Sequence, residues 1–202
     1  MQRFLVILTV MDKQVLKQIL RDNQQEVVRY VIEPREITLA EFPCCVLVGV
    51  RRSGKSYMLY HQIQQLLREG RQWDEMLYLN FEDERLEGFE TEDFNRLLEC
   101  HQEMYGKRPI LFLDEIQNIE HWEKFARRMA DSNYTIYITG SNAFLLSADL
   151  ATLFTGRYIE IHMFPFSFKE YCEYYSDQAD KDKLFEEYFV KGGLAGSYAY
   201  NT

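Results

Sequence analysis

Apolar residues along this chain fall into two patterns. Short continuous runs, of the length of buried strands, occur at 44–48, 76–81, 109–113, 134–139 and 158–161. Between these runs, apolar residues recur at the spacing of an amphipathic helix, around 58–67, 91–104, 122–129 and 147–154. Strands that alternate with helices predict an α/β fold, in which helices cover both faces of a parallel sheet.

Helical patterns also flank this alternation. Residues 11–30 carry apolar positions at helical spacing, and Pro34 breaks the pattern. After the last strand, Ser167 and Glu170 have the spacing of a capping box that begins a helix. Another helix is expected at 181–191. We therefore expect three parts, namely a helical extension at 1–33, a core at 34–163 and a C-terminal helical segment at 164–202.

The first strand leads directly into a G-x-x-x-x-G-K-S motif at 49–56. Its glycines let successive N–H groups face a phosphate, and the following helix adds its positive dipole end. Lys55 then neutralises the β- and γ-phosphates, and the Ser56 hydroxyl ligates Mg²⁺. The alternative is a glycine turn with an incidental lysine. The predicted nucleotide-binding residues are Gly49, Val50, Arg51, Arg52, Ser53, Gly54, Lys55, Ser56 and Tyr57.

Two acidic residues follow the third strand and supply the other half of the predicted site. Asp114 lies at the strand's carboxyl end, where it can hold Mg²⁺ beside Ser56, and Glu115 can activate water as a general base. The alternative for such a pair is a helix cap or a solvated turn. The chain lacks the base-reading Asn-Lys-x-Asp of a GTPase, and a kinase does not need a glutamate beside the Mg²⁺ aspartate.

Three further catalytic candidates lie nearer the end of the core. Ser141 or Asn142, after the fourth strand, can sense the γ-phosphate or hold the water, although a strand-end turn uses the same residues. Arg157 can neutralise transition-state charge from its own subunit or from a neighbour, or it is a solvated surface residue.

Arg51 and Arg52 lie inside the G-x-x-x-x-G-K-S motif, at positions that the motif leaves free. They either contact the nucleotide or a partner, or they are surface charge beside an anion site.

Composition excludes several other classes of function. A formal net charge of −9 argues against a surface built for nonspecific nucleic-acid binding. The 4 cysteines and 4 histidines lack metal-ligand spacing, and the cysteines are interpreted as reduced packing residues. The apolar run at 4–8 is too short to span a bilayer, so we expect a cytoplasmic protein with no membrane partner.

Taken together, these motifs resemble family fourteen of the AAA superfamily of P-loop ATPases, a family of bacterial and archaeal proteins. The resemblance covers nearly all of 34–193. The segments that carry it are 33–36 (Glu-Pro-Arg-Glu), 49–56, 78–85, 113–117 (Leu-Asp-Glu-Ile-Gln), 139–142 (Thr-Gly-Ser-Asn), 155–157 (Thr-Gly-Arg) and 164–171.

The resemblance implies a three-layer P-loop NTPase fold, with a parallel five-stranded sheet of order 5-1-4-3-2. It also implies ATP as the nucleotide, and the roles given above for Lys55, Ser56, Asp114 and Glu115. Proteins of this family continue past a segment like 192–194 into a C-terminal region that is nuclease-like in part. We therefore expect a truncated form, with the missing region or an unknown protein partner completing it.

The leading functional prediction is a Mg²⁺-dependent ATPase in which Glu115 activates water. A second hypothesis is a nucleotide-gated regulatory or interaction module with negligible turnover of its own. A third is a P-loop kinase, which would pass the phosphate to an acceptor other than water. Since Arg157 can act within a subunit or across an interface, the sequence is compatible with both a monomer and a homo-oligomer.

Overall fold

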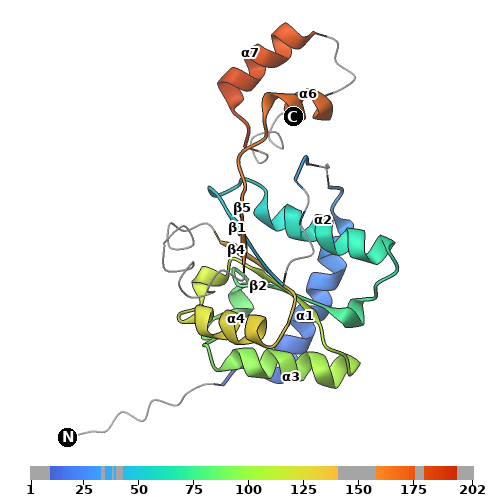
Figure 1. Ribbon diagram of the computed structural model, residues 1–202, viewed down its shortest axis with the longest axis vertical. Helices are drawn as coiled ribbons and strands as arrows, with labels where there is room; N and C mark the ends of the chain where they lie inside the picture. Colours follow the sequence, from blue (N-terminus) through green and yellow to red (C-terminus); the bar gives the residue numbers. More distant parts are fainter. Residues whose placement is uncertain are drawn as a thin grey trace, which may run out of the picture.

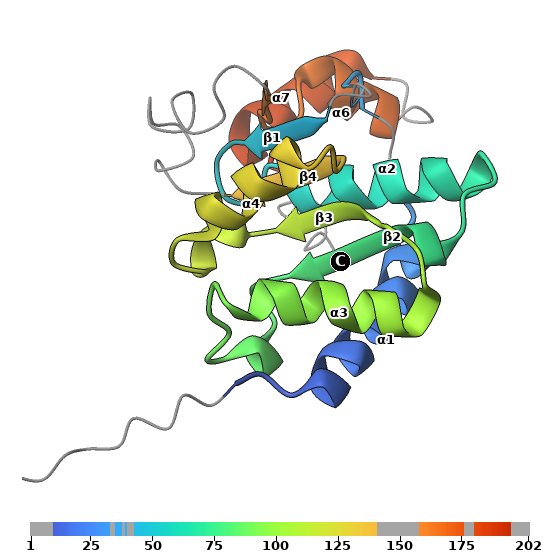
Figure 2. The ribbon, with the colours of Figure 1, turned by 60° about the horizontal axis from the view of Figure 1, so that its bottom comes forward.

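A parallel five-stranded sheet forms the centre of the molecule in the computed structural model, which describes residues 10–32, 35–37, 39, 43–140, 158–175 and 180–194 (Figures 1 and 2). The strands are β1 Cys44–Val48, β2 Met76–Asn80, β3 Ile110–Asp114, β4 Ile136–Gly140 and β5 Ile159–His162. Their order is β2-β3-β4-β1-β5, and every neighbouring pair is parallel. This is the predicted order 5-1-4-3-2 counted from the opposite edge, so the predicted fold is confirmed.

Alternate residues of each strand face opposite sides of the sheet and enter separate apolar cores. In β1, Cys44, Val46 and Val48 lie in one core, and Cys45 and Leu47 lie in the other. Helices α3 and α4 cover the first core, and α2 covers the second, which explains why the strands are apolar throughout. The bounds of these helices are α2 Lys55–Arg68, α3 Asp93–Tyr105 and α4 Trp122–Asp131.

Helix α1, Lys13–Arg29, packs along β2 at the edge of the sheet (Figure 2). Leu16 and Ile19 join the core shared with α3, whereas Val27 joins the core shared with α2. The helix begins at Asp12, whose carboxylate accepts the N–H groups of Gln14 and Val15. The edge of the sheet that β2 would otherwise expose is thereby covered.

The C-terminal helices pack on each other beyond the end of β5, as an outer lobe (Figure 1). They are α6 Phe168–Tyr174 and α7 Lys181–Lys191, so the helix predicted at 181–191 is confirmed. The predicted capping box is also present, since the Glu170 N–H donates to Ser167 Oγ at 3.2 Å and the Ser167 N–H donates to Glu170 Oε2 at 2.8 Å. The helix predicted at 147–154 lies outside the described residues.

Short 3₁₀ helices connect several elements, and their bounds are η1 Trp73–Glu75, η2 Glu84–Leu86 and η3 Ile116–Asn118. All cysteines are free, as predicted. Burial raises the pKa of the Cys44 thiol to about 12, so this thiol is inert at neutral pH. Within the described ranges, no helix has the length and apolarity needed to cross a membrane.

Candidate functional site

The loop between β1 and α2 turns tightly through residues 49–54. The Ser53 N–H donates to the Val50 carbonyl at 3.2 Å, and the Met58 N–H donates to the Gly54 carbonyl at 3.0 Å to begin α2. Gly54 has a φ of +93°, in the left-handed region that glycine enters without a steric penalty. The second glycine of the motif is therefore required by the turn that leads into the helix.

The first glycine is required for a different reason. A Cβ atom on Gly49 would overlap the carbonyl oxygen of Met163, which follows β5. The two segments are also joined by a hydrogen bond of 2.7 Å from the Met163 N–H to the Val48 carbonyl. Inside the loop, Ser53 Oγ is buried and has no hydrogen-bond partner among the described residues. The loop thus combines a close backbone approach to β5 with a buried hydroxyl that no described residue binds.

Lys55 is the first residue of α2, and its side chain is only 2% exposed. Its ammonium group donates to the carbonyls of Gly49 and Val50, at 3.3 and 3.2 Å. The same Nζ lies 3.8 Å from Glu115 Oε1. The fold therefore fixes one buried positive charge between the loop and an acidic side chain.

Asp114 ends β3 and is fully buried. Its Oδ1 accepts hydrogen bonds from Ser56 Oγ, at 3.2 Å, and from Thr139 Oγ1, while its Oδ2 accepts one from the Tyr78 hydroxyl at 2.9 Å. Burial raises the pKa of Asp114, and the three hydroxyl donors oppose this shift. The carboxylate is held in one orientation by hydroxyls from α2, β2 and β4.

Glu115 follows at once, with a φ of +51° and a ψ of +44°. This left-handed conformation costs a residue with a side chain about 1–2 kcal/mol, and it turns the chain sharply away from the strand. The Glu115 N–H donates to Thr139 Oγ1 at 3.0 Å, and Glu115 Oε2 accepts from Gln117 Nε2 at 2.6 Å. The Thr139 hydroxyl therefore contacts both acidic residues at once.

The donor atoms at this place fit a phosphate-bound magnesium ion. Ser56 Oγ and the Asp114 carboxylate are both oxygen ligands, which Mg²⁺ prefers. No group of three or more histidine, cysteine or acidic side chains able to hold a metal occurs among the described residues. Protein ligands alone are therefore too few here, as is usual where phosphate oxygens and water complete the shell of Mg²⁺. The Ser53 hydroxyl, which has no hydrogen-bond partner in the part of the chain that the structure describes, and the buried Lys55 likewise suit an anion.

The remaining predicted residues lie around this centre. The Tyr57 ring, 45% exposed, packs against Tyr30 and Tyr60 at centroid distances of 5.2 and 5.6 Å. Arg52 has a φ of +64° at the exposed tip of the loop. Ser141, Asn142 and Arg157 lie outside the described residues.

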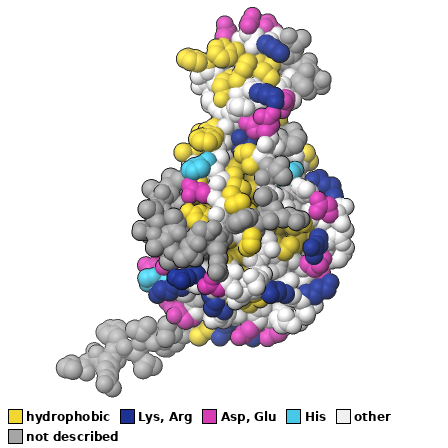
Figure 3. Space-filling view, in the orientation of Figure 1, with side chains coloured by type: hydrophobic (Ala, Val, Ile, Leu, Met, Phe, Trp, Pro, Cys, Tyr) yellow, Lys and Arg dark blue, Asp and Glu magenta, His cyan; other side chains and the backbone are white. Residues whose placement is uncertain are grey.

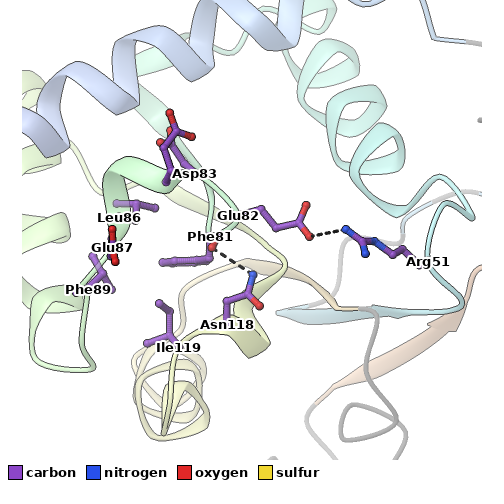
Figure 4. A pocket seen from close by; sticks show the side chains of 11 residues that line it. Arg51, Phe81, Glu82, Asp83, Leu86, Glu87, Phe89, Asn118 and Ile119 are labelled. Carbon is purple, nitrogen blue, oxygen red and sulfur yellow. Dashed lines mark hydrogen bonds and ion pairs between the residues drawn. The ribbon is translucent and has the colours of Figure 1, made fainter.

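Arg51 reaches from the loop to the mouth of a pocket beside the carboxyl end of β2 (Figure 4). Its guanidinium lies 3.7 Å from Glu82 Oε1, and its side chain is 80% exposed. The pocket has a volume of about 630 Å³ and combines an acidic rim with apolar side chains that include Phe81 and Phe89. Figure 4 shows Glu82 directed at Arg51 across this mouth.

Comparison with known proteins agrees with this geometry. The model of AAA family fourteen, which is described as a AAA domain, matches residues 41–172. The match covers more than half of the chain. The chain belongs to the AAA family of P-loop ATPases. Nucleotide binding follows from this membership, and the family predicted from the sequence motifs is confirmed.

Two curated relatives of this AAA chain come from an archaeon and a bacterium. The chain is 33% identical over 205 residues to protein MJ1544 of Methanocaldococcus jannaschii, covering 95% of this chain and 45% of that protein. A Haemophilus influenzae protein is 40% identical over 154 residues, covering 74% and 38%. The chain thus spans less than half the length of these relatives. Among solved structures, Cdc6p from Pyrobaculum aerophilum aligns with a TM-score of 0.47 and 16% identity, over 86% of this chain and 57% of that one.

Two residues that sequence reasoning did not single out complete the AAA site. The sequence patterns give Thr139 and Tyr78 no role of their own: Thr139 belongs to the strand and strand-end turn that precede Ser141, Tyr78 belongs to a strand, and both belong to segments that carry the family resemblance. Both lie on strands next to β3, and both donate to Asp114. The available signal was a hydroxyl near the carboxyl end of a neighbouring apolar strand, which parallel pairing brings beside Asp114.

Proposed function

We propose that this AAA domain binds ATP with Mg²⁺ and hydrolyses it. The proposal is supported above all by the convergence of Lys55, Ser56, Asp114 and Glu115, which come from α2 and the end of β3. Ser56 Oγ lies 3.2 Å from Asp114, and Lys55 Nζ lies 3.8 Å from Glu115. A cation, a hydroxyl and two carboxylates in contact beside a phosphate-sized loop are the set that phosphoryl transfer to water needs.

Binding is assigned to the loop and the start of α2. The N–H groups of the loop and the Lys55 ammonium contact the phosphates, while Ser56 Oγ and the Asp114 carboxylate hold the magnesium ion. The bound ion offsets charge on the phosphate oxygens. Tyr78 and Thr139 keep the Asp114 carboxylate turned toward Ser56, so that little reorientation is needed when the metal arrives.

Water activation is assigned to Glu115. Its carboxylate accepts a proton from the attacking water, and the Thr139 hydroxyl fixes its backbone through the Glu115 N–H. From their positions in the sequence, Ser141 or Asn142 is assigned the contact with the γ-phosphate. Arg157 is assigned transition-state charge neutralisation, from the same subunit or from a neighbouring copy. ATP is proposed over GTP because the chain lacks the guanine-reading motif.

Phosphate release by the wild type and by Glu115→Gln tests this proposal. We expect Mg²⁺-dependent release by the wild type and a rate lower by about 100-fold or more in the variant, because the general base is lost. ATP affinity, measured by titration of the same samples, is expected to stay within about threefold of wild type. Equal rates of phosphate release from the two proteins would remove Glu115 from the mechanism.

A second candidate is a nucleotide-gated interaction module that turns over only when a partner completes the site. It is supported by the contacts of Glu115, whose Oε2 accepts from Gln117 and whose Oε1 faces Lys55. A base that is held in this way has to be released before it can activate water. Phosphate release per molecule that rises steeply with protein concentration, or on addition of a partner, would favour the gated module over a self-sufficient ATPase.

A further inference from the structure

The guanidinium of Arg35 is buried in a set of contacts that the proposed mechanism does not use. Its Nε and Nη2 donate to Glu170 Oε1 and Oε2, at 2.9 and 3.2 Å, and the Arg35 side chain is only 8% exposed. Its Nη1 donates to the carbonyls of Ser53 and Phe164, at 3.1 and 3.0 Å. The guanidinium also lies 4.5 Å from the centre of the Phe166 ring.

One of these contacts, the hydrogen bond to the Ser53 carbonyl, holds the phosphate loop. Ser53 and Gly54 share a peptide unit, and Arg35 binds its carbonyl oxygen. In a planar trans peptide the N–H points opposite to the carbonyl, so Arg35 also fixes the direction of the Gly54 N–H. Gly54 directly precedes Lys55, and its N–H is one of the loop donors assigned to phosphate. The position of Arg35 therefore sets the orientation of a proposed phosphate donor.

The other contacts hold the start of the outer lobe. Glu170 is the capping-box residue of α6, and its Oε2 also accepts from the Ser167 N–H and Oγ. Phe166 is in turn bound to the end of α7, because its carbonyl accepts from the Tyr188 hydroxyl at 2.8 Å and its N–H donates to the Gly193 carbonyl at 2.6 Å. The segment 164–170, which Arg35 contacts, thus leads into α6 and is hydrogen-bonded to the end of α7. Both helices stand apart from the sheet (Figures 1 and 3).

We propose that Arg35 is a positioning residue that couples the phosphate loop to the α6–α7 lobe, an inference that rests on the proposed nucleotide site. A bidentate arginine–carboxylate pair is directional, so displacement of α6 moves the guanidinium and with it the Ser53–Gly54 peptide. The coupling is reciprocal, since any ligand that favours one loop conformation favours the matching lobe position. A molecule that binds α6 or α7 and favours one position of the lobe therefore changes nucleotide affinity without touching the nucleotide.

The test measures binding of a fluorescent ATP analogue to the full chain carrying Arg35→Lys or Glu170→Gln. Both variants keep the fold's apolar contacts but break the bidentate pair, and each is expected to weaken binding about tenfold. The matched control is Lys169→Gln, which removes the ion pair of the exposed neighbouring lysine with Glu36 and is expected to leave affinity unchanged. Wild-type affinity in both folded variants would overturn the proposal.

Hydrogen exchange of the wild type separates coupling from a merely structural role of Arg35, because a structural role alone does not make the exchange rates in the lobe depend on nucleotide. Saturation with ATP is expected to slow exchange of the amides of α6, and no change there would overturn the coupling even if a variant fails to fold. Phosphate release is measured on the same samples. If only the coupling is wrong, phosphate release and its dependence on Glu115 are still observed. If the proposed function is wrong, no phosphate release is observed, but the affinities of the variants for the ATP analogue can still be compared.

Discussion

At the scale of single residues, the Thr139 hydroxyl contacts both acidic residues of the site. It accepts the Glu115 N–H at 3.0 Å and donates to Asp114 Oδ1, so one hydroxyl satisfies a backbone donor and a buried acceptor. Asp114 is fully buried, and a buried carboxylate that loses a donor is left with part of its desolvation cost uncompensated. Thr139 is therefore expected to matter for both stability and turnover.

Thr139→Val tests this expectation with an isosteric change. The free energy of unfolding, measured by urea titration, is expected to fall by about 1–3 kcal/mol because the Asp114 carboxylate and the Glu115 N–H each lose a hydrogen-bond partner. Phosphate release is expected to fall at least about tenfold, since the Asp114 carboxylate and the Glu115 backbone each lose a contact that positions them. Thr139→Ser keeps the hydroxyl and is the control. A Thr139→Val protein with the turnover of the wild type would show that the hydroxyl does not position Asp114 and Glu115 for catalysis.

Residues such as Thr139 mark the limit of what the sequence predicts. Lys55, Ser56, Asp114 and Glu115 could be predicted as site residues because their motifs are local. Thr139 and Tyr78 bind Asp114 across 25 and 36 positions of sequence, and their apolar neighbours make them resemble ordinary strand residues. Arg35 reaches 18, 129 and 135 positions to its hydrogen-bond partners. Contacts of this kind depend on strand order and packing, which no local pattern encodes.

At the scale of elements, β1 and β5 together shape the phosphate loop. The Met163 N–H continues the pairing of these strands to Val48, and this brings the Met163 carbonyl against Gly49. The strands themselves were predictable, since buried strands are continuous apolar runs. β2 was expected at 76–81 and is Met76–Asn80, and β3 was expected at 109–113 and is Ile110–Asp114. The close approach of β5 to the loop was not, because glycine in this motif is equally explained by the turn.

Gly49→Ala is expected to separate these two explanations. A methyl group at this position overlaps the Met163 carbonyl, and such overpacking lowers the free energy of unfolding by about 1–3 kcal/mol. ATP affinity is expected to fall as well, because the loop must move away from β5. Urea unfolding and nucleotide titration measure the two effects, with Arg68→Ala at the other end of α2 as the control. An unchanged stability would mean that the strands separate easily at this point.

At the scale of the whole molecule, the sheet divides two apolar cores, and the outer lobe adds exposed apolar side chains. Phe185, Phe189 and Val190 of α7 are 52%, 81% and 83% exposed, and Figure 3 shows apolar side chains gathered on this lobe. Away from this lobe, a few titratable side chains are buried. One of them is His101 on α3, which is 1% exposed. Such a group links the stability of the whole fold to pH.

The sign of that linkage follows from the direction of the shift. Burial lowers the pKa of His101 below its ordinary value of 6.5, so below that pH the unfolded chain binds a proton that the folded protein excludes. The contribution of His101 to stability is complete above pH 6.5 and is lost as pH falls toward the folded pKa.

Urea unfolding of the wild type and His101→Phe, between about pH 8 and pH 5, measures this contribution. The wild type is expected to lose more stability on acidification than the variant, which keeps an aromatic ring beside Tyr105. His121→Gln replaces a histidine whose side chain is 65% exposed, and it is expected to follow the wild type. Parallel pH profiles for the wild type and His101→Phe would show that His101 is not the linked group.

The central claim, that this AAA domain cleaves ATP at the loop with Glu115 as the base, is tested most directly by a single-turnover experiment. An excess of protein is mixed with ATP labelled in the γ-phosphate and with Mg²⁺, and the label is followed by rapid quenching. The account predicts that the wild type converts its bound ATP to labelled inorganic phosphate and that Glu115→Gln binds the ATP but leaves it intact. Bound ATP that stays intact on the wild type, or that the variant cleaves equally fast, would contradict it.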